Sequence, residues 1–223
     1  PDIMLLSQLR ANGKLQQGYL LLALCIACFS LSLVRVYYTE SRTYLFLNWN
    51  LFLAFIPWAL SSWLTIRPKL AKSWLALLPV LGAWLLFFPN APYILTDLYH
   101  LKPRFGAPVW YDLILILSFA WTGLMFGFLS LIDLEEILAR KLPKWGVILS
   151  TVALLFLSAF GIYLGRYLRW NSWDILTQPF GLFADIGDRF VNPREHPRTW
   201  GVTIFMGFFL NMLYWSFRLT RRN

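Results

Sequence analysis

An aspartate and a histidine three residues apart, Asp97 and His100, are the pair best suited to chemistry in this sequence. On a helix this spacing puts both side chains on one face, together with Tyr93 four residues before the aspartate. Such a pair can exchange protons with a substrate or supply half of a metal site. The second histidine, His196, lies in a proline-flanked charged segment, so we expect no metal site and no cofactor.

The pair follows a break in a long apolar run. Pro89 and Pro92 interrupt the helix there, because proline lacks an amide donor and clashes with the preceding turn. Asn90 lies between them, and it predicts an N-cap for the short helix that holds Asp97 and His100. A broken apolar helix that leads into a polar face predicts a site at a membrane boundary.

Polar residues also occur at the ends of other apolar runs. Polar groups within membrane helices are costly and usually face the bundle interior or a wet cavity. We therefore predict one shared cavity, in which Arg166 could pair with an acidic residue. The candidate catalytic residues are Asp97, His100, Asp112 and Asp174. The candidate substrate-binding residues are Asn48, Asn50, Asn90, Tyr93, Arg166, Arg169 and Asn171. The alternative is a network of ion pairs and caps that ties loops to helix ends.

Composition places the elements in a bilayer. Of the 223 residues, 58% are hydrophobic and only 14% are charged, whereas soluble domains have about 25% charged residues. We predict an all-α polytopic membrane helix bundle of about six transmembrane helices plus short interfacial helices. Residues 1–17 are expected to form an N-terminal interfacial segment, and residues 18–219 a single domain. The predicted spans are 18–38, 44–66, 73–88, 110–132, 146–168 and 200–217.

Two connections between the spans have patterns of their own. Residues 133–144 predict a charged loop. Residues 179–190 have Phe180, Phe183, Ile186 and Phe190 at helical spacing, which predicts an amphipathic helix on the membrane surface.

The charges predict an orientation. Six spans put both termini on one side, and the basic loops 67–72 and 140–144 and the basic C-terminus share that side. The positive-inside rule then predicts cytoplasmic termini, in a bacterial inner membrane or, as an alternative, an internal thylakoid-type membrane. The net charge of +9 is attributed to contact with anionic lipid, so nucleic acid is not an expected partner.

Two small-residue patterns predict close helix packing. Gly123 and Gly127 are four residues apart in one predicted span, as are Gly161 and Gly165 in another. The C-x-x-C pair of Cys25 and Cys28 lies inside an apolar run. Hydrocarbon disfavours the thiolate that redox chemistry needs, so these cysteines are expected to pack in the core.

Several motifs together resemble a known family. They are the Phe-Pro-Asn-Ala-Pro-Tyr sequence from residue 88 with Thr96-Asp97-Leu98 and His100, then Trp110-Tyr111-Asp112, and finally Gly165-Arg166 with the segment 169–174. Residues 43–219 resemble the domain-of-unknown-function family 1361. The resemblance implies a prokaryotic integral membrane protein and implies no activity or residue role.

Three functions remain open from the sequence. The first is an enzyme that uses the acidic residues and His100 on a lipid or lipid-linked substrate, with arginines that bind a phosphate or carboxylate. The second is a small-solute transporter or permease, because broken helices next to polar groups are common in transporters. The third is a non-catalytic membrane subunit or assembly factor that contacts lipid or a membrane protein partner.

Overall fold

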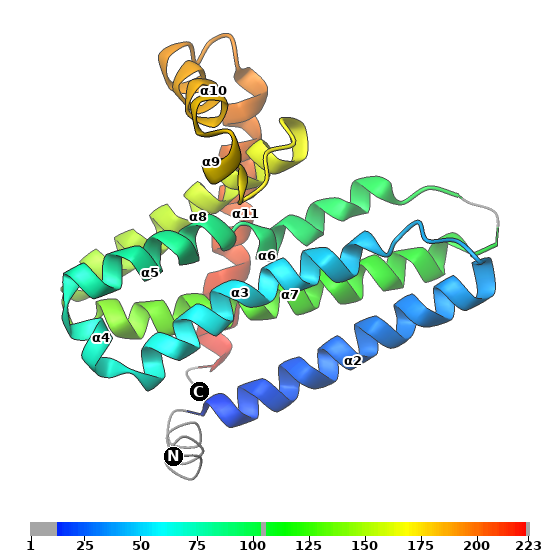
Figure 1. The fold of residues 1–223 in the computed structure, drawn as a ribbon, viewed down its shortest axis with the longest axis horizontal. Helices are drawn as coiled ribbons and strands as arrows, with labels where there is room; N and C mark the ends of the chain where they lie inside the picture. Colours follow the sequence, from blue (N-terminus) through cyan, green and yellow to red (C-terminus); the bar gives the residue numbers. More distant parts are fainter. Residues whose placement is uncertain (1–12, 104–105, 222–223) are drawn as a thin grey trace. The chain divides into compact units, whose positions relative to one another are not determined.

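The computed structural model describes residues 13–103 and 106–221, and its elements are helices with no strand among these residues (Figure 1). Within these described ranges, six helical stretches are long and apolar enough to cross a membrane, which confirms the prediction of an all-α multi-pass membrane protein. Five of them are the single helices α2 (Lys14–Thr39), α3 (Phe46–Ile66), α7 (Val109–Leu138), α8 (Lys144–Tyr167) and α11 (Pro197–Arg221).

The remaining stretch, Trp74–His100, is interrupted. It consists of α5 (Trp74–Phe87), α6 (Asn90–Tyr93) and the 3-10 helix η1 (Ile94–His100). The other helices of the described residues are α4 (Pro68–Lys72), α9 (Asp174–Thr177) and α10 (Pro179–Val191). The chain forms two compact units, residues 1–141 and 142–223, and each is described by itself.

The first unit is built around α7. Most of this helix is buried, because α2, α3 and the α6–η1 segment all pack against it. Its buried residues lie on every side of the helix, from Leu115 to Leu138. In Figure 1 the blue α2 and the cyan α3 run alongside the green α7. Because α7 lies at the centre of this unit, polar side chains of the neighbouring helices bond to it.

Two glycines let the broken segment approach α7 closely. A Cβ atom added at Gly123 would lie 2.8 Å from the carbonyl oxygen of Ala91 and 2.8 Å from Cδ1 of Ile94. One added at Gly127 would lie 2.9 Å from Cβ of Ala91. These distances are too short for real atoms, so the predicted packing role of this glycine pair is confirmed.

The helix α2 is tied to α7 by a buried ion pair near each end. Lys14 bonds to Asp133 at one end, and Arg35 bonds to Asp112 at the other. At 1.5 Å per residue the helix between Lys14 and Arg35 is about 31 Å long, close to the thickness of about 30 Å of a bilayer's hydrocarbon core. The two pairs are therefore far enough apart to lie at the two boundaries of a membrane.

These pairs correct two predicted boundaries. The first span begins at Lys14 and not at residue 18, because Asp133 neutralises the Lys14 charge. The predicted loop 133–144 is wrong at its start, because α7 continues to Leu138 and buries Asp133 and Glu135. Ser61 of α3 donates a further hydrogen bond to Asp133 at 2.7 Å. The rest of the predicted interfacial segment, residues 1–12, lies outside the described residues.

The second unit is built on α8 and α11, which pack along each other. A Cβ atom at Gly207 would lie 2.2 Å from Cδ1 of Phe156, so the glycine admits this ring between the helices. The helices α9 and α10 lie at the end of the pair where α8 ends and α11 begins (Figure 1).

Candidate functional site

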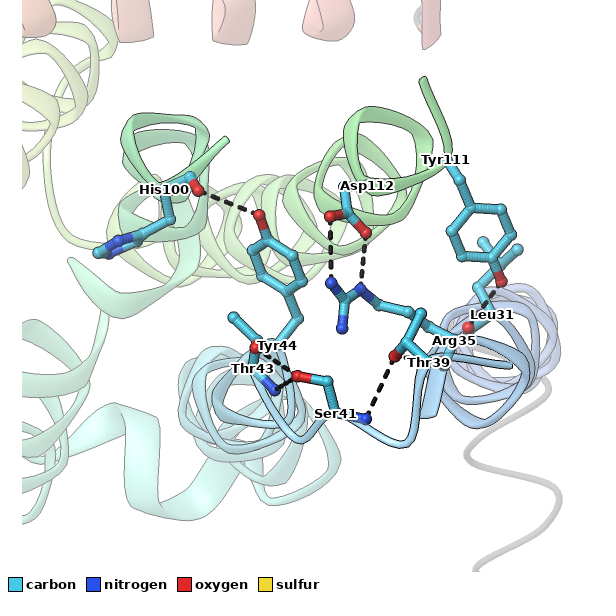
Figure 2. Close-up of polar contacts among 9 residues, drawn as sticks. All are labelled: Leu31, Arg35, Thr39, Ser41, Thr43, Tyr44, His100, Tyr111 and Asp112. Atoms are coloured by element: carbon cyan, nitrogen blue, oxygen red, sulfur yellow. Dashed lines mark hydrogen bonds and ion pairs between the residues drawn. The ribbon is translucent and has the colours of Figure 1, made fainter. Parts of the chain in front are cut away.

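The centre of the candidate site is the ion pair between Arg35 of α2 and Asp112 of α7 (Figure 2). The Nε atom of Arg35 donates to Oδ1 of Asp112 at 2.6 Å, and Nη2 donates to Oδ2 at 3.1 Å. Both side chains are buried, with 2% and 1% of their surface exposed. Because a two-point arginine–carboxylate contact fixes both groups, Asp112 holds α2 to the start of α7.

Tyr44 connects this ion pair to the broken helix. The guanidinium carbon of Arg35 lies 4.5 Å from the centre of the Tyr44 ring, which is a cation–π contact. The Tyr44 hydroxyl donates to the main-chain carbonyl of His100 at 3.0 Å, and Figure 2 shows this ring between the two residues. Asp112, Arg35 and Tyr44 thus form a continuous chain of contacts that holds the last residue of η1.

His100 itself is exposed. Its ring lies 5.4 Å from the ring of Phe46, edge to face. Asp97 of the same 3-10 helix is completely buried, with 0% of its surface exposed. In a 3-10 helix residues three apart lie above each other, so the side chains of Asp97 and His100 leave η1 on the same side. The Asp97 side chain is buried there, whereas the His100 side chain reaches the surface.

Asp97 is anchored from α3. The Asn50 amide donates to Oδ2 of Asp97 at 2.9 Å, so the structure brings together two of the predicted site residues. Asn48 lies two residues earlier and faces a different helix, because its amide donates to Oγ of Ser32 in α2 at 3.1 Å. Asn48 therefore links α2 to α3 and does not join Asn50 at Asp97.

The other two predicted residues of this segment lie in α6. Asn90 is the first residue of α6, and its amide donates back to the carbonyl of Phe87 at 2.9 Å. The prediction that it caps the following helix is wrong, since its side chain ties the break to the end of α5. Tyr93 is half-buried, and its carbonyl accepts a hydrogen bond from Thr96 at 2.6 Å.

The remaining candidates belong to the second unit. Arg166 is half-buried in the last turn of α8, and Arg169 follows with a positive φ of 64°. Asp174 begins α9, and its Oδ2 atom accepts from the main-chain N–H of Asn171 at 2.7 Å. The Asp174 carboxylate thus closes the turn that precedes α9, whose N-cap residue Trp173 makes no side-chain cap hydrogen bond. That Arg166, Arg169, Asn171 and Asp174 share a cavity with Asp97 stays a prediction.

Asp174 gives this turn a dependence on pH. The Asn171 main-chain hydrogen bond, assisted by Thr177, holds the Asp174 pKa below its usual range. A lowered folded-state pKa stabilises the fold above the unfolded value of about 3.9, and the effect is lost as pH falls through the folded value. We therefore expect the Asn171 amide to lose protection from hydrogen exchange below about pH 4, after correction for the intrinsic rate. Asp174→Asn should remove that extra protection already at neutral pH, and a wild-type amide still equally protected in stronger acid would contradict the assignment.

Sequence reasoning missed Arg35 and Tyr44. Arg35 lies inside the apolar run of the first span, and a charged residue in that position usually faces the bundle interior. This signal was available, and it identifies Arg35 as a buried residue and not as a loop charge. The sequence offered Arg166 as a partner for Asp97, Asp112 or Asp174, whereas Asp112 pairs with Arg35 in the structure. No group of three or more metal-binding side chains occurs among residues 13–103 and 106–221.

The comparisons with known proteins give one match. The profile of a family described as a protein of unknown function (DUF1361) matches residues 49–213. This range includes α7 and every predicted site residue except Asn48. No curated protein and no solved structure matches the chain.

Proposed function

The chain belongs to the DUF1361 family, and we propose from its geometry that it is a membrane enzyme acting on a lipid or lipid-linked substrate. The observation that supports this proposal is His100, an exposed imidazole held at the end of a broken membrane helix. Histidine is the side chain that most readily changes charge at physiological pH. His100 is therefore the residue that exchanges a proton with the substrate.

The surroundings of His100 fit an amphiphilic substrate. Phe46 lies against its ring, Tyr99 precedes it in η1 and is 62% exposed, and Trp49, one turn after Phe46 in α3, is 53% exposed. Aromatic side chains of this kind are typical of the boundary between the bilayer and water. A substrate with an apolar tail can lie along these rings while its polar head reaches the imidazole.

The buried carboxylates act differently from His100. Both oxygens of Asp112 accept hydrogen bonds from Arg35, so we assign Asp112, Arg35 and Tyr44 as positioning residues. Asp97 lies under η1 on the side from which His100 extends, and we assign it to hold the helix that presents the imidazole.

The proposed location is a bacterial inner membrane with cytoplasmic termini. The basic loop 67–72 includes α4, and the exposed Arg140 and the half-buried Lys141 follow α7. Both segments lie at the end of the first unit's helices opposite Arg35 and His100, because these helices run in alternating directions (Figure 1). The positive-inside rule then puts His100 on the outer side.

The enzyme proposal is tested by the lipids of a bacterial host that expresses the protein. We expect mass spectra of the total lipid extract to show at least one species that the wild-type chain produces or depletes. His100→Gln should reduce this change by about 100-fold or more, which is the usual contribution of a general acid or base. His196→Gln is the matched control, since it alters the other histidine and should preserve the change.

Two outcomes contradict the proposal. If wild-type protein that is folded and abundant in the membrane leaves every lipid species unchanged, the protein is not a lipid enzyme. If His100→Gln produces the same change as the wild type, the reaction does not depend on the imidazole.

A further inference from the structure

The helix α10 has its apolar and charged faces in an unusual arrangement. Arg189 is 7% exposed, whereas Phe180, Phe183 and Val191 are 90%, 59% and 78% exposed. A helix that lies on a soluble protein turns its apolar face inward and its charged face to water. In α10 most of the aromatic surface points away from the protein.

Polar contacts hold α10 in this rotation. The indole N–H of Trp170 donates to Oδ2 of Asp185 at 2.7 Å, and Arg189 bonds to the same carboxylate at 3.2 Å. On the following turn, Asp188 and His196 are in contact at 2.6 Å. Gly181 lies against the indole, because a Cβ atom there would be 3.1 Å from Cη2 of Trp170. The helix cannot turn its phenylalanines inward without breaking these contacts.

The phenylalanines Phe180, Phe183 and Phe190 form the exposed row of α10. The ring contacts of Phe190 show how deep this row lies along the spanning helices. The Phe190 ring lies 5.7 Å from that of Phe160 in α8 and 5.2 Å from that of Trp200 in α11. Phe160 lies inside the membrane-spanning helix that ends at Tyr167, about 10 Å from that end at 1.5 Å per residue. The apolar row of α10 is therefore continuous with the apolar surface of two spans.

From this continuity we propose that α10 inserts Phe180, Phe183 and Phe190 into the membrane leaflet where α8 ends and α11 begins. The occupant of the exposed row is lipid, and the helix lies in the plane of the interface. Arg169, Arg194 and Arg198 come before and after α10 in the chain and are exposed, and their charge matches the negative charge of anionic headgroups. The proposal is independent of any reaction at His100.

The depth of α10 can be measured with a spin label. Phe183→Cys is labelled in a chain that also has Cys25→Ala and Cys28→Ser, and the protein is inserted into phosphatidylcholine vesicles with a minority of phosphatidylglycerol. We expect oxygen, which concentrates in lipid, to collide with the label several-fold more often than a water-soluble nickel complex does. Asn192→Cys is the matched control, because Asn192 is exposed just after α10 and should show the opposite ratio.

Each result decides the proposal. If the nickel complex reaches position 183 as easily as position 192, the row faces water and the proposal is wrong. If neither reagent reaches position 183, another protein surface covers the row, and the lipid assignment is also wrong. If the Phe183→Cys protein does not fold, Phe180→Cys serves as the second variant, because Phe180 is 90% exposed and its substitution leaves the packing intact.

Discussion

Replacement of Arg35 by alanine should lower the free energy of unfolding by about 3–5 kcal/mol, the usual cost of breaking a buried ion pair. Asp112 is 1% exposed and both of its oxygens accept hydrogen bonds from Arg35. The substitution therefore leaves a buried carboxylate without its counter-ion. The measurement is reversible unfolding in detergent micelles, followed by the loss of helical signal as a denaturing detergent is added.

Three further variants separate the ion pair from simple loss of packing. Arg35→Ala combined with Asp112→Ala should be less damaging than the sum of the two single changes, because neither charge is then left alone. Arg35→Lys should restore only part of the stability, since an ammonium group cannot make the two-point contact. Arg42→Ala is the matched control at an exposed position, and its effect should stay within about 0.5 kcal/mol. Equal effects of Arg35→Ala and Arg42→Ala would contradict the buried pair.

Replacement of Gly123 by alanine is the second change with a large expected effect. The new methyl group would lie 2.8 Å from the carbonyl oxygen of Ala91, and a backbone atom cannot move aside as a flexible side chain can. Overpacking of this kind costs about 1–3 kcal/mol. It should also displace α6 and η1 from α7, and with them Asp97 and His100.

The matched control for this change is Gly82→Ala in α5. A Cβ atom at Gly82 would meet nothing within 4 Å, so alanine there should be neutral or stabilise the helix by up to about 1 kcal/mol. The two substitutions are chemically identical and are expected to have opposite signs. The same unfolding measurement compares them, and a stabilising Gly123→Ala would show that α6 does not pack as closely on α7 as the structure indicates.

The membrane-spanning helices could be predicted from the sequence because each is determined locally. A run of about 20 apolar residues must form a helix in hydrocarbon, since every backbone polar group has to be bonded within the segment. The break at Pro89 and Pro92 follows from proline's missing amide donor in the same way. The close packing at Gly123 and Gly127 was also visible as a spacing, whereas the atoms of Ala91 and Ile94 that fill the space were not.

The length of α7 shows where local reasoning failed. Asp133 and Glu135 are acidic residues, and charge at the end of an apolar run usually indicates a loop. In the structure the helix continues to Leu138, because Lys14 comes from the far end of the first unit's sequence to neutralise Asp133. A contact between residues 119 positions apart has no local signal in the chain.

The sequence by itself determined the membrane class, the six apolar helices and the break that ends at His100, because these depend on properties of neighbouring residues. The tertiary structure alone decided that Asp112 pairs with Arg35, that Tyr44 connects the pair to His100, and that α10 turns its phenylalanines outward. The physical reason is that each polar side chain had several partners of suitable chemistry along the sequence. Only the packing of α2, α3 and η1 around α7 brings one of them within hydrogen-bonding distance.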